Sequence, residues 1–211
     1  MSENEKKRLL YPNEIVDPRT VPFSSAKFRG YLPHLYKDGC TYFVTFCLVD
    51  VVEDRRLARQ TLERKEDPTE IAESYEPRPF AGSCVLREPV SARIVEDALL
   101  YFQGERYALS SWCVMPNHVH VVMTPHHSHP LQRILHSWKS FTAHEINRQN
   151  GSSGPVWQEE SFDHAVRDQD SLQRFITYTE MNPVSAGLVD QPELWPFSSA
   201  RLRIEGEEDH L

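Results

Sequence analysis

Two histidines, His118 and His120, lie one residue apart in the apolar segment "MPNHVHVV". On a β-strand the side chains at positions i and i+2 share one face, so a strand here sets both imidazoles side by side. Neutral imidazole is a common ligand of divalent metals, and two imidazoles arranged in this way can hold one cation. The same pattern is also typical of a solvent-facing strand that carries polar residues, so the pair alone leaves both interpretations open.

A second group with chemical potential lies in "FITYTEMNPV", where Tyr178 and Asn182 are four residues apart. Residues at that spacing lie on one edge of a helix. The tyrosine hydroxyl could act as a nucleophile, and the carboxamide oxygen could be a third metal ligand. Taken alone, Tyr178 fits the rim of a core and Asn182-Pro183 fits a helix terminator. The presence of both groups in one small domain favours a shared site.

Strands and helices must position these residues, and the hydrophobic pattern predicts them. Strands are expected at 40–50, 107–114, 118–124 and 160–168. A helix is expected in 89–107, where "QG" marks its end, and another after Ser128, which can cap it, with Pro130 in its first turn. A last helix is expected over 169–182, stopped by Pro183.

This order of elements predicts an α+β fold of the ferredoxin-like, split βαβ type. Its antiparallel sheet carries helices on one face, and a C-terminal helix bearing Tyr178 is appended. If the valines of 118–124 face the helices, both imidazoles lie on the opposite, open face. The predicted organisation is an extended arm at 1–30, a domain at 31–200 with a charged surface excursion at 54–79, and an acidic tail at 201–211.

Composition limits the function classes. No apolar stretch is long enough to span a bilayer, and the polar start is not a signal peptide, which predicts a cytoplasmic protein without membrane partners. The four cysteines show no CxxC spacing and are expected to be reduced core thiols. The net charge of −8 is unfavourable for nucleic-acid binding. Acidic residues gather in 50–76 and in the tail, so a local basic groove remains compatible with the sequence.

Five blocks in order resemble the REP-associated tyrosine transposases, which are single-tyrosine HUH transposases that process single-stranded DNA. The blocks are "SSWCVMPNHVHVVMTP", "HSWKSFTAHEINRQNG", "GPVWQEESFDHAVRD", "YTEMNPVSAGLV" and "WPFSSA". HUH denotes two histidines around a hydrophobic residue, here His118-Val119-His120. The resemblance implies a ferredoxin-like fold, in agreement with the order of elements.

The resemblance also implies roles for single residues. His118 and His120 match the metal-binding histidines of the family, Asn182 matches its third ligand, and Tyr178 matches the nucleophile. The implied reaction is a transesterification with Mg²⁺ or Mn²⁺ that cleaves and rejoins single-stranded or hairpin DNA at REP-like sites through a 5′-phosphotyrosine. A monomer and a homodimer both remain open, as does the question of whether Tyr178 completes the site of its own chain or of a partner.

Candidate DNA contacts are cationic side chains near these elements, although each also fits an ordinary solvated charge. Lys139, within "WKSF", is the first choice, and Arg29 is included by resemblance. The remaining candidates are Arg133, Arg167 and Arg174. Trp112 and Trp157 could stack on unpaired bases or pack in the core.

Two other functions remain open. A protein of this fold could bind hairpin DNA as a regulator without catalysing a reaction. The histidines could also activate water in a metal hydrolase, with Tyr178 incidental.

Overall fold

The sheet has the strand order of the predicted fold. The computed structural model describes residues 9–12, 14–22, 25–29, 32–51 and 80–203, with backbone only for 25–36. Within them, β3 (Tyr42–Cys47), β4 (Tyr107–Val114), β5 (His118–Pro125) and β6 (Phe162–Ala165) form an antiparallel sheet in the order β4-β5-β3-β6. β5 therefore lies between β3 and β4, which are joined through a helix as in a split βαβ unit.

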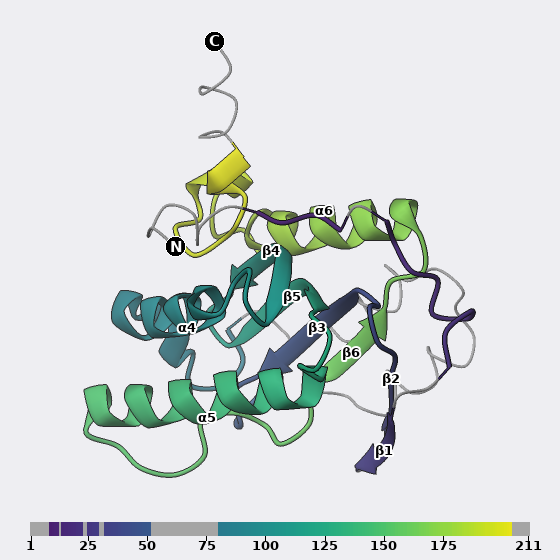
Figure 1. Cartoon of the computed structure of the whole chain (residues 1–211). Coiled ribbons are helices and arrows are strands. Elements are labelled where there is room, and N and C mark those ends of the chain that lie inside the picture. Colours follow the sequence, from purple (N-terminus) through teal and green to yellow (C-terminus); the bar gives the residue numbers. More distant parts are fainter. Residues whose placement is uncertain (1–8, 13, 23–24, 30–31, 52–79, 204–211) are drawn as a thin grey trace.

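Helices cover both faces of this sheet (Figure 1). The two helices of the split βαβ units share one face as expected, and the appended C-terminal helix covers the other. α4 (Pro89–Tyr101) and α5 (Leu131–Asn150) pack on one face, and α6 (Gln169–Ser185) packs on the other. The histidine face is therefore not open. It also carries Phe43 and Val122, whose burial against Leu172, Phe175 and Ile176 of α6 explains why the helix lies there.

Alternation along β5 separates two sets of side chains. Val119, Val121 and Met123 belong to the main core with α4 and α5, as the sequence predicts. His118 and His120 are on the alternate face, under α6, together with Val122. The two-residue period of a strand thus aims the imidazoles at the tyrosine-bearing helix.

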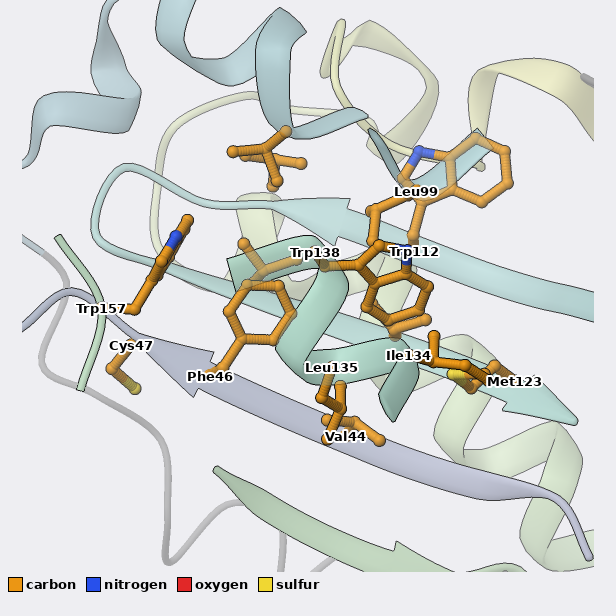
Figure 2. Packing of buried hydrophobic residues seen from close by; sticks show 14 of the residues in the cluster. Val44, Phe46, Cys47, Leu99, Trp112, Met123, Ile134, Leu135, Trp138 and Trp157 are labelled. Carbon is orange, nitrogen blue, oxygen red and sulfur yellow. The ribbon is translucent and has the colours of Figure 1, made fainter. Parts of the chain in front are cut away.

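The main core is rich in aromatic side chains (Figure 2). Trp112 and Trp157 are both buried in it, so they pack in the core and are not exposed for base stacking. Each indole nitrogen has a buried partner: Trp112 Nε1 donates to Glu96 Oε1 at 3.1 Å, and Trp157 Nε1 donates to Thr142 Oγ1 at 2.9 Å.

Two predicted helix ends are wrong. α5 begins at Leu131 with Pro130 as its N-cap, and Ser128 adopts a left-handed backbone (φ 72°) two residues before that cap. Ser128 is thus too early in the chain to cap the helix. α6 continues through Pro183 to Ser185, because proline removes one helical donor without preventing the bonds of the next turn, such as Ala186 N to Asn182 O.

Both ends of the described chain cover the outer edge of β4. Leu10 N donates to Leu109 O, and Val114 N donates to Phe197 O, each at 2.9 Å. The Ser198–Ser199 segment continues this cover beside Trp112 and Cys113. The "WPFSSA" block therefore shields a sheet edge that would otherwise expose unpaired backbone groups.

The predicted domain boundaries stay predictions. β1 (Ser25–Arg29) and β2 (Leu32–Tyr36), which pair antiparallel, lie on either side of the predicted end of the arm at residue 30. Residues 201–203 are helical, while the whole charged excursion at 54–79 and residues 204–211 lie outside the described part. All four cysteines are unbridged, three of them buried. None of the described helices combines the length and hydropathy required to cross a bilayer.

Candidate functional site

The two imidazoles of β5 face each other. His118 Nε2 and His120 Nε2 are 3.0 Å apart, and both residues are at most 1% exposed. Their outer nitrogens have separate partners: His118 Nδ1 lies 2.7 Å from Asn117 Oδ1, and His120 Nδ1 lies 2.7 Å from Thr45 Oγ1. Metal-ligating histidines typically have this arrangement, with one ring nitrogen bonded to a polar group and the other turned toward the cation.

Tyr178 of α6 joins this pair within the same chain. Its ring lies edge-on to the ring of His120, with centroids 5.4 Å apart, and edge-on to Phe43 at 5.6 Å. The Phe43 ring in turn stacks on Phe175 at 4.6 Å. Tyr178 is only partly buried at the border of this cluster, so its side chain reaches the surface of the protein.

The contacts between α6 and the sheet indicate which residue of β5 lies beside Asn182. Phe175 stacks on Phe43, the strand partner of Val122, and Tyr178 lies beside His120. α6 thus runs antiparallel to β5. Asn182 is four residues after Tyr178, which is an advance of about 6 Å along the helix, and His118 is two residues before His120, which is about 6.6 Å along the strand. We therefore expect Asn182 to lie at the level of His118. Asn182 is 5% exposed.

These donors fit a divalent cation. Among the described residues, no group of three His, Cys, Asp or Glu side chains could hold a metal. A ligand set built on His118 and His120 therefore needs a third donor of another type, and an amide oxygen or a DNA phosphate oxygen meets that need. The separation of the two Nε2 atoms suits two ligands of one ion.

Lys139 has a structural role in this protein. Its ammonium donates to Glu159 O at 2.9 Å, to Ser161 Oγ at 3.1 Å and to Glu160 O at 3.4 Å, which uses all three hydrogens. Burial lowers the pKa of Lys139 to about 8. The side chain lines a cavity of about 680 Å³ between α5 and residues 155–163, on the α5 layer of the fold. Its predicted contact with DNA is untested, and this geometry does not favour it.

Arg174 is the best located of the predicted DNA contacts. It is exposed and lies four residues before Tyr178, hence on the same edge of α6. Arg167 is exposed between β6 and α6, whereas Arg133 is exposed on α5, in the opposite layer. Arg29 ends β1, and its side chain lies outside the described part.

His164 is a partly buried imidazole that the sequence analysis did not select. It lies opposite Phe43 in the β3–β6 pairing and 5.7 Å from the Phe175 ring. Burial, together with the nearby Arg167 guanidinium, lowers the pKa of His164 to about 4. This histidine is therefore neutral at physiological pH.

Other contributors were also missed. Asn117 and Thr45 hold the outer nitrogens of the imidazoles, and Glu180 and Ser199 attach α6 to β4. The asparagine directly precedes His118 in "PNHVH", which is the only sequence signal that could have indicated it. The other three are brought in by segments distant in the chain.

Comparison with known proteins identifies relatives. Residues 84–181 match the family described as "Transposase IS200 like". The chain is 26% identical over 109 residues to the REP-associated tyrosine transposase of Escherichia coli K12, covering 51% of this chain and 63% of that protein. It is 28% identical over 105 residues to a Haemophilus influenzae protein named for the same group, covering 45% and 60%. The match thus spans about three-fifths of the length of these relatives.

A solved structure has the same fold. A REP-associated tyrosine transposase bound to a REP hairpin aligns with a TM-score of 0.52 and 20% identity over 86% of each chain. At this identity the alignment supports the architecture of an antiparallel four-stranded sheet with helices. The site residues must be argued from the geometry given above.

Proposed function

We propose that this chain, a relative of the IS200-like transposases, cleaves and rejoins single-stranded DNA through a covalent bond between Tyr178 and the DNA. One observation carries the proposal. The Tyr178 ring lies against the ring of His120, whose Nε2 faces that of His118 at 3.0 Å. A nucleophile and a pair of metal-binding groups are thereby combined at one partly exposed point.

His118, His120 and Asn182 are the proposed ligands of a divalent cation. Mg²⁺ or Mn²⁺ is expected by analogy with the HUH transposases. When bound, such a cation acts as a Lewis acid toward the scissile phosphate. The imidazoles contribute neutral Nε2 donors, and the amide contributes an oxygen without adding negative charge that would repel DNA.

Tyr178 is the proposed nucleophile. Its Oη forms a bond to phosphorus while the bond from phosphorus to the 3′-oxygen breaks. The phenol proton is lost to solvent, and the departing 3′-oxygen takes up a proton. The products are a 5′-phosphotyrosine and a free 3′-hydroxyl. Because the phosphodiester energy is retained, attack by another 3′-hydroxyl reverses the step and joins two strands.

The relatives support a hairpin-bearing strand as the substrate. Two are named for REP-associated tyrosine transposases, and the solved relative binds a REP hairpin. The exposed Arg174, on the same helix edge as Tyr178, is a suitable phosphate contact beside the reacting group. The position of Tyr178 beside His120 of its own chain favours a site completed in cis.

A covalent adduct assay tests the function. The full chain is incubated with Mn²⁺ and a pool of single-stranded oligonucleotides that carry hairpins with varied flanks. With a label at the 3′ end, cleavage transfers the label to the protein, and with a label at the 5′ end, it releases a shorter free fragment. Tyr178→Phe should abolish both signals. Tyr101→Phe, at an exposed tyrosine on α4, is the matched control and should retain them.

Two outcomes would support other functions. Hairpin DNA that is bound but left intact across the whole pool would indicate a regulator without catalytic activity. Cleavage without labelled protein, retained in Tyr178→Phe, would indicate hydrolysis by water.

A further inference from the structure

The side chain of Asn117 connects the imidazole pair to a separate loop. Its Oδ1 lies 2.7 Å from His118 Nδ1, and its Nδ2 donates to Ala81 O at 2.9 Å. Because only the NH₂ group can donate to a carbonyl, the bond to Ala81 fixes the orientation of the amide. Oδ1 must then accept from His118, which holds the ring proton on Nδ1 and leaves Nε2 as the lone-pair nitrogen.

Thr45 holds the ring of His120 in place. The two residues are direct partners in the β3–β5 ladder, and Thr45 Oγ1 lies 2.7 Å from His120 Nδ1. Both residues are buried, so this hydroxyl replaces water as the partner of the ring. A hydroxyl can donate to Nδ1 or accept from it, so this contact fixes the ring of His120, with its Nε2 3.0 Å from that of His118, and not its tautomer.

We propose that Asn117 and Thr45 are positioning residues: Asn117 keeps His118 in the Nδ1–H form, and Thr45 holds the ring of His120, so that both Nε2 atoms are directed at one divalent cation. The proposal rests on the proposed function only for the kind of ligand bound. Neither residue touches the DNA or the reacting phosphate. Each acts through a histidine, and its removal is expected to weaken cation binding by about 10- to 100-fold.

The loop of residues 80–84 supplies the carbonyl that holds the Asn117 amide, and its own conformation is fixed. Its backbone has positive φ at Phe80 (66°) and Cys84 (51°), a conformation that residues with a side chain keep only where the surroundings enforce it, and at Gly82 (78°), where it costs no strain. Ser83 N donates to Asp50 Oδ2 at 2.6 Å, and a Cβ at Gly82 would lie 2.7 Å from Asp50 Oδ1. This fit holds the carbonyl of Ala81 where Asn117 requires it.

Imidazole NMR of the full chain without metal is the first test. Long-range ¹H–¹⁵N spectra distinguish the two tautomers, and the measurement is made near pH 8, well above the usual histidine pKa of about 6.5. The wild type should show the Nδ1–H form at His118. An Nε2–H form at His118 would overturn the role of Asn117.

Isosteric variants provide the second test, with the dissociation constant for Mn²⁺ as readout. Thr45→Val keeps the shape but removes the hydroxyl, and should loosen the ring of His120 and weaken Mn²⁺ binding. Thr45→Ser restores the hydroxyl and should recover the affinity. Asn117→Ala should shift His118 toward a mixture of tautomers and weaken Mn²⁺ binding. Asn147→Ala on α5, which removes an amide bonded to Gly154 O, should change neither the tautomer nor the affinity. Unchanged Mn²⁺ affinity in Thr45→Val would refute the role of Thr45, and an unchanged His118 tautomer in Asn117→Ala would refute that of Asn117.

These readouts separate the two proposals. A wild type with the expected His118 tautomer and Mn²⁺ binding, but without a DNA adduct, would contradict the proposed function alone. A normal adduct together with wild-type Mn²⁺ affinity in both Thr45→Val and Asn117→Ala would contradict the positioning role alone.

Discussion

The ring of Tyr178 lies edge-on against the ring of His120 in the same chain, with 5.4 Å between the centroids. α6 therefore supplies the proposed nucleophile to the imidazole pair of its own sheet. The contact follows from the burial of Phe175 and Ile176 against Phe43 and Val122, which sets the helix in register with β5. If one chain supplies the whole site, two inactive variants cannot complement each other when mixed.

Mixing two inactive variants should not restore activity. Tyr178→Phe lacks the nucleophile and His120→Ala lacks a ligand, and with the site completed in cis neither chain can supply what the other lacks. Equal amounts of the two are mixed and assayed for the protein–DNA adduct. Recovery of a substantial part of the wild-type adduct would show that Tyr178 acts in trans.

Substitution of Arg174 should change the affinity for DNA, whereas substitution of Lys139 should change the stability of the fold. Arg174→Gln removes an exposed cation beside Tyr178, and should weaken single-stranded DNA binding and reduce the slope of log K against log salt by about 1. Lys139→Gln should leave that slope unchanged and lower the free energy of unfolding, because three acceptors near residues 159–161 lose their donor. Binding titrations at several salt concentrations and thermal unfolding measure the two effects. A reduced salt slope in Lys139→Gln, with an unchanged slope in Arg174→Gln, would indicate that Lys139 contacts DNA.

Ser199→Ala should destabilise the fold and displace α6. Ser199 Oγ donates to Glu180 Oε1 at 2.6 Å and accepts from Trp112 N at 3.0 Å, all within buried surroundings. The loss leaves a buried backbone donor unsatisfied, at a cost of about 1–3 kcal/mol. Because Glu180 lies two residues after Tyr178, adduct formation should also slow.

Denaturant unfolding measures this cost, with Ser152→Ala as control. Ser152 is exposed and bonds Asn147 Oδ1, so its loss should stay within about 0.5 kcal/mol. A loss of unfolding free energy in Ser199→Ala as small as that in Ser152→Ala would show that the link from β4 to α6 contributes no stability.

His164 should make stability depend on pH. Its pKa is lowered by burial from 6.5 to about 4, so below pH 6.5 the unfolded chain binds a proton that the folded chain does not. The free energy of unfolding should therefore fall as the pH is lowered from about 6.5 to about 4, by roughly 2–3 kcal/mol from this residue. Unfolding of the wild type and of His164→Phe, measured across that range, checks the sign. An equally steep profile in the variant would contradict the assignment.

The sequence predicted the parts of the fold that depend on local periodicity. Alternation in "HVHVVM" correctly separated His118 and His120 from the valines, and the order of strands and helices gave the correct sheet. The end of α6 was wrong because Pro183 removes a single donor, which a buried helix tolerates. The open face was wrong because Phe43 and Val122, on that face, need apolar cover, and local patterns do not reveal which helix supplies it.

The amino-acid sequence by itself determined that the two imidazoles share one strand face, and that Tyr178 and Asn182 share one helix edge, because both relations follow from the repeat of a regular backbone. Only the tertiary structure decided that α6 lies over the histidines, that the Lys139 ammonium bonds residues 159–161, and that the amide of Asn117 is held by Ala81. These relations join segments far apart in the chain, and they arise from the burial of apolar surface and from buried polar groups finding partners, which no local spacing records.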